Sequence, residues 1–111
     1  MSDPTDRCAR PLDTAGLVAY ERGAVVSRTL IKKPVGTVTR FSFDKGECEG
    51  LSEPTTAFDA LLTGLDGAAE VTIAGQAHRV AAGQSIIMPG GKPHALQAVE
   101  RFKMMLVMLR A

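Results

Sequence analysis

The sequence predicts a single all-β domain with little helix, and three observations support this prediction. Short segments rich in β-branched and aromatic residues recur along the chain, separated by Gly, Pro or Asp every ~8–12 residues, which is typical of β-sandwiches and barrels. No stretch keeps the helical hydrophobic period of about 3.6 residues for more than two turns, so helices are minor. The length of 111 residues suits one domain of ordinary size.

Composition and charge exclude several classes of protein. Hydrophobic residues make up 45% and charged residues 23%, which excludes disordered and collagen-like chains. A formal net charge of +1 is too small for nucleic-acid binding through bulk charge. The apolar runs are far shorter than the ~18 residues of a membrane-spanning helix, and the polar start of the chain does not resemble a secretory signal. We therefore expect a cytoplasmic protein with no nucleic-acid or membrane partner, in which Cys8 and Cys48 are ordinary reduced residues.

The chain divides into a polar leader and a β-rich domain. Residues 1–16 are polar and interrupted by prolines, which predicts a loose leader, and residues 17–111 form the domain. The acidic stretch 44–54 contains two glycines and is expected to be a loop. Strands are expected, in chain order, at 23–31, 35–43, 57–65, 68–73, 77–81, 85–88, 94–99 and 102–109.

Two pairs of residues predict tight turns between these strands. Asp66-Gly67 lies between two apolar runs, which predicts a β-hairpin with a type I′ turn, because that turn needs positive φ angles. Gly75-Gln76 predicts a second turn before the strand at 77–81.

Two strands differ in the pattern of their faces. Strand 35–43 alternates, with Phe41 and Phe43 on one face and Arg40 on the other, where Arg40 is expected to be one of several scattered surface charges. Strand 102–109 is apolar on both faces, so both must be covered. Either this strand is central in its sheet, or a second subunit covers its outer face. We expect a homodimer on this ground.

The turn before strand 94–99 resembles a known motif. It reads Gly83, five residues, Pro89, one residue, Gly91, two residues and His94. This spacing is similar to the second conserved motif of the cupin superfamily, with Ala98 where that family has an Asn. The resemblance implies a double-sheet jelly-roll (cupin) barrel whose open end holds the functional pocket.

The resemblance covers roughly residues 35–109, but the chain departs from it at the first cupin motif, in which two His and one Glu serve as metal ligands. When the final Gly of that motif is placed on Gly67, the Glu position falls on Ala60. The two His positions then fall on about Pro54 and Thr56. The ligands of the first motif are therefore missing from this chain.

His94 is the one usual metal-ligand position that this chain retains, as the resemblance implies. A single imidazole holds a divalent first-row metal weakly, because such a metal needs three or four ligands. We therefore expect no tightly bound metal. A makeshift transition-metal site of His94, Glu53 and Asp59 is the remaining metal hypothesis, although Asp59 has the strand parity opposite to the Glu position.

Several functions remain open at this stage. The leading hypothesis is a domain that binds a small organic ligand in a pocket lined by His94, Phe41, Phe58, Met88 and Leu96. The alternative is a cupin enzyme of the isomerase, cyclase or dioxygenase type that uses His94 with a non-standard metal site or with none. A third class is a sugar- or partner-binding regulatory module. His94 itself suits a pocket residue and a buried histidine bonded to a backbone carbonyl equally well.

Overall fold

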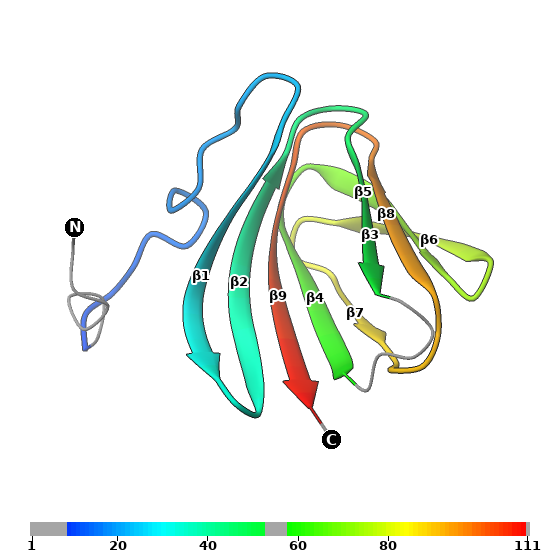
Figure 1. Cartoon of the computed structure of the whole chain (residues 1–111). Helices are drawn as coiled ribbons and strands as arrows, with labels where there is room; N and C mark the ends of the chain where they lie inside the picture. The colour runs from blue at the N-terminus through cyan, green and yellow to red at the C-terminus, as the bar shows by residue number, and fades with distance from the viewer. Residues whose placement is uncertain (1–8, 53–57, 111) are drawn as a thin grey trace.

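The computed structural model describes residues 9–52 and 58–110, which form two packed β-sheets without a helix (Figure 1). One sheet has five strands in the order β1-β2-β9-β4-β7, and the other has four in the order β3-β8-β5-β6. The strands are β1 (Val25–Lys33), β2 (Gly36–Phe43), β3 (Cys48–Ser52), β4 (Phe58–Asp66), β5 (Ala68–Ile73), β6 (Gln76–Ala81), β7 (Ser85–Met88), β8 (His94–Ala98) and β9 (Phe102–Arg110). The predicted all-β, double-sheet fold is confirmed.

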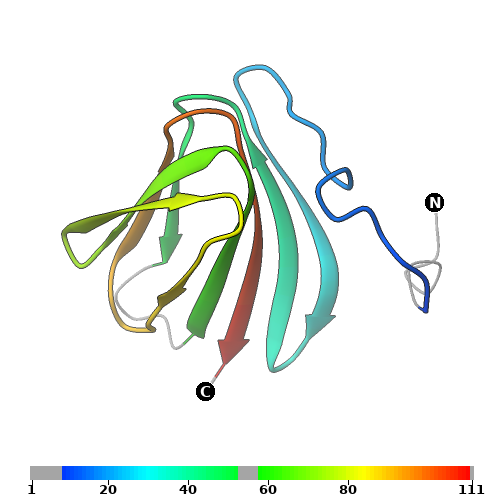
Figure 2. The same ribbon diagram turned by 180° about the vertical axis from the view of Figure 1, so that it is seen from behind.

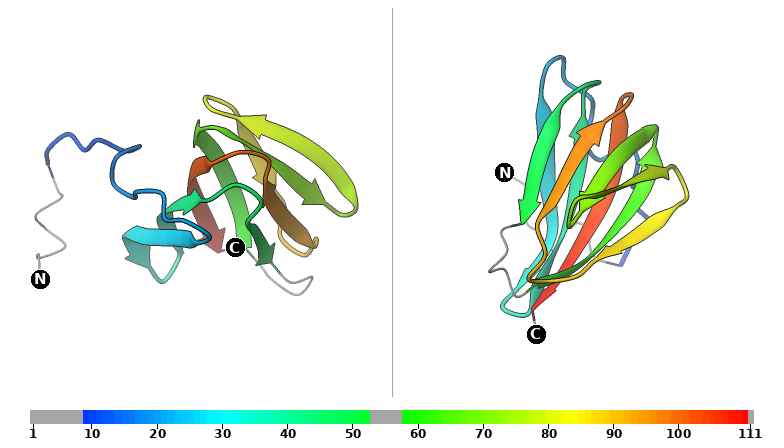
Figure 3. Two further views of the ribbon diagram at one scale, coloured as in Figure 1. Left: turned by 90° about the horizontal axis from the view of Figure 1, so that it is seen from above. Right: turned by 90° about the vertical axis from the view of Figure 1, so that its right-hand side faces the viewer.

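The chain crosses repeatedly between the two sheets and so closes them into a flattened barrel. The consecutive strands β2 and β3, β4 and β5, and β8 and β9 belong to different sheets. Figure 2 shows this arrangement from behind, and Figure 3 shows the two sheets as facing layers. The inward faces of both sheets form one core, made of Phe43, Ala60, Leu62, Ala69, Val71, Val80, Met88, Leu96, Ala98, Phe102, Met104 and Leu106.

β9 lies in the centre of the five-stranded sheet, between β2 and β4. Its inward side chains Phe102, Met104 and Leu106 are at most 4% exposed. The prediction that this strand is central in its sheet is therefore confirmed. Its outward side chains are less buried than its inward ones, and Leu109 on the outward face is exposed.

The prediction of a hairpin at Asp66-Gly67 is wrong. β4 and β5 flank this turn, but they belong to different sheets and do not pair with each other. Gly67 has a φ of 73°, and Asp66 does not share a positive φ, whereas a type I′ turn needs two. Gly67 instead forms a corner between the sheets, where its carbonyl oxygen accepts a hydrogen bond from the Ala82 amide at 3.1 Å.

The turn with two positive φ angles occurs between β5 and β6. Ala74 and Gly75 have φ angles of 49° and 84°, and the flanking residues Ile73 and Gln76 pair across the hairpin. The second predicted turn is therefore present, one residue earlier than expected. Its two positive φ angles are those that the type I′ geometry requires.

The prediction of a loop over 44–54 is wrong in its second half, where Cys48–Ser52 forms β3. β3 lies at an edge of the four-stranded sheet and pairs antiparallel with β8. The pairing uses backbone N–H and C=O groups, which polar residues supply as well as apolar ones. A short edge strand that contains Glu49, Gly50 and Ser52 therefore lacks the hydrophobic signal from which strands are predicted.

The segment before β1 packs on the outer face of the five-stranded sheet. The Ser42 hydroxyl donates a hydrogen bond to the Val18 carbonyl oxygen at 2.8 Å. The Lys103 ammonium donates to the Ala15 carbonyl oxygen at 2.7 Å. Val18 is only 4% exposed, so this segment packs against the sheet and covers part of its outer face.

Arg40 lies on this outer face of β2 and is completely buried, so the expectation of a surface charge there is wrong. Its Nε, Nη1 and Nη2 atoms have no hydrogen-bond partner within the described part of the chain. Burial lowers the pKa of Arg40, because the charged form loses its hydration, and the nearby Asp13 carboxylate opposes this effect. The covering segment, which a strand pattern does not reveal, is the reason for the burial.

Tyr20 ties the same segment to the end of β4. Its hydroxyl donates a hydrogen bond to the Asp66 carboxylate. The Lys103 ammonium and the Arg101 guanidinium carbon lie 4.9 Å and 5.3 Å from the centre of its ring, within the range of cation–π contacts. Burial and the hydrogen bond to Asp66 raise the pKa of Tyr20 above its ordinary value.

We expect Gly67→Ala to destabilise the fold by about 3 kcal/mol or more, because the new Cβ would overlap the Arg101 carbonyl oxygen. Gly75→Ala is the matched control, since Gly75 also has a positive φ but has no atom near its added Cβ. The control should lose only the ~1–2 kcal/mol of a left-handed alanine. Urea unfolding of both variants gives the comparison, and equal losses would contradict the corner role of Gly67.

We expect Tyr20 to ionise above ~10, the pKa of an ordinary tyrosine. Because its folded pKa is raised, the contribution of Tyr20 to the free energy of unfolding is intact below that pH and is lost as the pH rises further. The chain has one Tyr and no Trp, so tyrosinate absorbance follows this residue alone. Asp66→Asn should lower the midpoint, and a wild-type midpoint equal to that of the urea-unfolded chain would contradict the contact.

Candidate functional site

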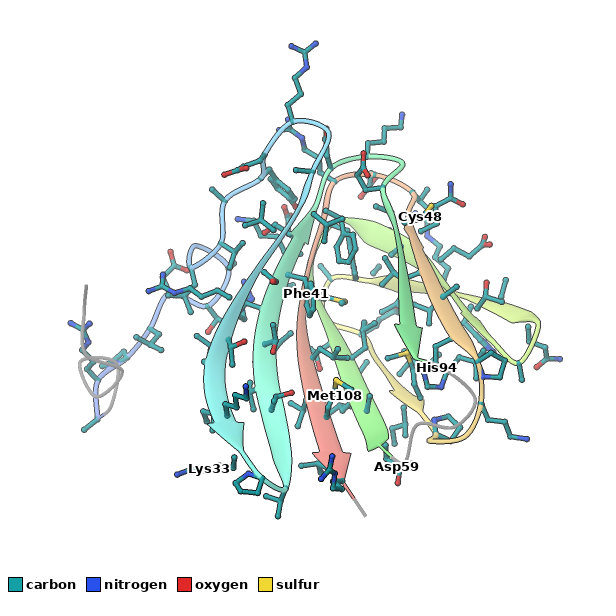
Figure 4. The ribbon with its side chains drawn as sticks, in the orientation of Figure 1. Lys33, Phe41, Cys48, Asp59, His94 and Met108 are labelled. Carbon is teal, nitrogen blue, oxygen red and sulfur yellow. The ribbon has the colours of Figure 1, made fainter. Side chains whose placement is uncertain are left out.

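His94 is the first residue of β8 and points into the barrel. Along this strand His94, Leu96 and Ala98 are 6%, 1% and 2% exposed, whereas Ala95 and Gln97 between them are exposed. This alternation places His94 on the same inward face as the core residues. Figure 4 shows it in the half of the barrel that also holds Met108 and Asp59.

The turn before β8 is held by side chains at two points. The Nε2 atom of His94 lies 2.9 Å from the Pro89 carbonyl oxygen, and since a carbonyl can only accept, Nε2 is the nitrogen that donates. The Asp59 carboxylate accepts a hydrogen bond from the Gly90 amide at 2.8 Å. The Pro-Gly-Gly turn and the two side chains therefore form one connected structure at this end of the barrel.

Apolar side chains surround His94 in the barrel. Ile73 is its register partner on β5. On the facing sheet, Ala60 pairs with both Met88 and Met108. Ile73 and Met108 are partly buried and pack against the core. Among these described residues, the imidazole is the polar group at the border of an apolar interior.

The other predicted pocket residues occupy different positions. Met88 and Leu96 are each 1% exposed and belong to the hydrophobic core. Phe41 is partly buried and stacks on Phe43 with 5.9 Å between ring centres, in the opposite half of the barrel from His94 (Figure 4). Phe58 begins β4, but its side chain lies outside the described part of the structure.

The donor groups at this end do not fit a cupin-type metal ion. Ala60, which takes the position of the Glu ligand, presents only a buried methyl group to the interior. Asp59 is exposed, as its strand parity predicts, and its carboxylate binds the Gly90 amide. Across residues 9–52 and 58–110, no group of three or more His, Cys, Asp or Glu side chains could hold a metal ion. One imidazole among apolar side chains is a poor donor set for a first-row metal.

Three of the sequence-based positions cannot be placed in this site. Glu53, the weak metal candidate, and the positions of the missing histidines, Pro54 and Thr56, fall in 53–57, outside the described residues. Ile73 and Met108, in contrast, were not among the predicted site residues. Strand pairing places Ile73 beside His94 and Met108 beside Ala60 on the facing sheet, and β-sheet register between distant segments leaves no local signal in a sequence.

The closed antiparallel barrel and the Gly-Pro-Gly-His turn define a small jelly-roll domain of the cupin class. The sequence model of the cupin domain matches residues 39–109. This chain therefore belongs to the cupin family, as the spacing from Gly83 to His94 predicts.

Solved structures agree with this assignment. A conserved protein of unknown function from Streptococcus pyogenes is 44% identical over 93% of this chain and 89% of its own, with a TM-score of 0.86. A cupin superfamily protein from Desulfitobacterium hafniense is 29% identical over 93% of both chains, with a TM-score of 0.84. A cupin 2 conserved barrel domain protein from Leptotrichia buccalis is 36% identical over 89% of this chain and 47% of its own, with a TM-score of 0.81.

Curated protein sequences include no significant match to this chain. Within residues 9–52 and 58–110, there is also no helix that is long and apolar enough to cross a membrane.

We expect His94→Ala to lower the free energy of unfolding by about 1–3 kcal/mol, because it removes a buried ring and its hydrogen bond to Pro89. His78→Ala is the control, since His78 is exposed on β6 and should change stability by less than ~0.5 kcal/mol. Urea unfolding at neutral pH measures both. Equal stabilities of the two variants would show that the His94 ring adds nothing to the fold.

Proposed function

We propose that this cupin domain binds a small organic molecule at the barrel end that carries His94, without a resident metal ion. The observation that carries the proposal is the inward-facing imidazole at the start of β8, bordered by apolar side chains. Small-molecule sites are commonly apolar with a few polar groups that orient the ligand. Membership of the cupin family supports this location, because the family resemblance implies that the functional pocket lies at the open end of the barrel.

The side chains around His94 indicate the chemistry of the ligand. Ile73 and Met108 offer aliphatic and thioether surface, and neither brings a charge. Methionine side chains adapt to ligands of varied shape because they are unbranched and polarisable. We therefore propose a ligand that is mainly apolar, with one polar group that contacts the imidazole.

The methionines of the chain provide a test with an internal control. Met88, Met104 and Met108 face the interior or border it, whereas Met105 lies in the same register row as Arg40 on the outer face. In protein with methyl-labelled methionine, we expect small aromatic and aliphatic carboxylates and alcohols to shift the signals of Met88 and Met108. Met105 should remain unchanged. Titration followed by methyl NMR measures both effects.

A matched pair of variants connects these shifts to His94. His94→Gln keeps a side chain that can donate to the Pro89 carbonyl, yet it should weaken binding of any fragment that contacts the imidazole, whereas His78→Gln should not. Fragments that shift only Met105, or none that shift Met88 and Met108, would refute the proposal. Stoichiometric Zn²⁺ or Ni²⁺ binding that is lost in Asp59→Ala would instead favour the metal-dependent enzyme.

A further inference from the structure

The outer face of the five-stranded sheet carries a continuous row of aliphatic residues. Ile31 pairs with Val38, Val38 with Val107, Val107 with Leu61, and Leu61 with Ile87, so the row crosses all five strands. At a strand spacing of about 4.8 Å the row is ~20 Å wide. Ile31, Leu61 and Ile87 are 53%, 40% and 69% exposed.

The next row toward the Lys33 end carries opposite charges at its two sides. Lys33 pairs with Gly36, Gly36 with Leu109, and Leu109 with Asp59. Figure 4 shows Lys33 and Asp59 at the same end of the sheet, on opposite sides of β9. This row therefore has a basic side chain on β1 and an acidic side chain on β4, and Leu109, which is 56% exposed, lies between them.

Two shallow apolar hollows connect the two rows into one surface. Val107 and Leu109 line both hollows. Ile31 and Val35 line the hollow toward β1, and Leu61, Ile87 and Asp59 line the hollow toward β7. We call the surface formed by Ile31, Val35, Val38, Leu61, Ile87, Val107 and Leu109 the outer apolar patch.

The described part of the segment before β1, from residue 9 onward, covers the other half of this face. Its contacts reach Ser42 and Lys103, which lie two register rows beyond Val38 and Val107 on the same strands. Contiguous apolar surfaces of more than a few hundred Å² are rare on monomeric proteins and mark interaction sites. The outer apolar patch is therefore a surface suited to a partner.

We propose that a second copy of this chain covers the outer apolar patch, with the two five-stranded sheets face to face about a two-fold axis parallel to β9. Such an axis places the β1 side of one sheet over the β4 side of the other. Lys33 then faces Asp59 of the partner subunit, and the contact occurs twice by symmetry. An isologous interface must be self-complementary, and this charge arrangement meets that requirement.

The charges also disfavour the other in-plane axis. A two-fold axis perpendicular to the strands would place β1 over β1, so that the end of β1 with Lys33 meets the end with Arg28 of the partner subunit. Like charges would then face each other across the ~10 Å between packed sheets. The parallel axis instead gives aligned sheet packing, which sheet twist holds at an angle of about 30°.

A zero-length carbodiimide cross-link tests the axis directly, because it joins an amine to a carboxylate in contact. Within one chain Lys33 and Asp59 are three strand spacings apart, about 14 Å, so they do not form this link. We expect mass spectrometry of a mixture of isotopically light and heavy protein to find Lys33–Asp59 peptides that combine the two labels. A wild-type dimer cross-linked only at other positions would refute the proposed axis.

Sedimentation of variants over a micromolar concentration range tests the surface. We expect a wild-type dimer whose dissociation constant rises by more than about tenfold in Ile87→Asp and in Ile31→Asp. Val99→Asp is the matched control, because Val99 is 42% exposed but follows β8, outside the patch. Lys33→Glu should weaken the dimer several-fold, whereas Lys32→Glu, whose side chain points away from the outer row, should not.

Circular dichroism of each variant establishes that it is folded, and the edge positions of Ile31 and Ile87 provide two independent substitutions. A wild-type protein that remains monomeric at ~100 μM, well above the range of an ordinary stable dimer, would overturn the proposal. A dimer that persists unchanged in both folded variants would show that another surface mediates assembly, which also overturns it.

Discussion

The burial of the inward face of β9 is the constraint on which the arrangement of this domain depends. Phe102, Met104 and Leu106 face inward, and the four-stranded sheet covers them with the inward faces of β5 and β8. The segment before β1 covers part of the outward face, where Lys103 donates a hydrogen bond to the Ala15 carbonyl oxygen. An apolar sheet face is stable only if it is covered, so the core and this segment meet the same requirement from opposite sides, and the outer apolar patch is the part that they leave exposed.

Local patterns were sufficient to predict most strands and the family motif that ends at His94. The alternation over β2 placed Phe41 and Phe43 on the inward face, where both are found. The spacing from Gly83 to His94 located the family motif, because turn residues and the residue after them keep fixed offsets in a short segment. The exposed position of Asp59 beside the buried Ala60 followed from strand parity alone.

Features that depend on distant parts of the chain were not predictable in this way. Asp66-Gly67 has the composition of a hairpin, yet contacts with the following strands make it a corner between sheets. Arg40 is a charged residue in an alternating strand, a pattern that predicts an exposed side chain. The segment before β1, more than twenty residues earlier in the chain, buries it. The contact of Asp59 with the Gly90 amide spans 31 residues. Each of these depends on tertiary packing, which overrides local preference.

The way in which the segment before β1 is held has a consequence for the substitutions that it tolerates. The side chains of Ser42 and Lys103 donate hydrogen bonds to the carbonyl oxygens of Val18 and Ala15, and every residue type has a backbone carbonyl oxygen. Side-chain identity matters at a few positions, such as Val18, which is buried, and Tyr20, whose hydroxyl donates a hydrogen bond to Asp66. Most positions of this segment can therefore be substituted without loss of these two contacts, provided that the backbone keeps the same path across the sheet.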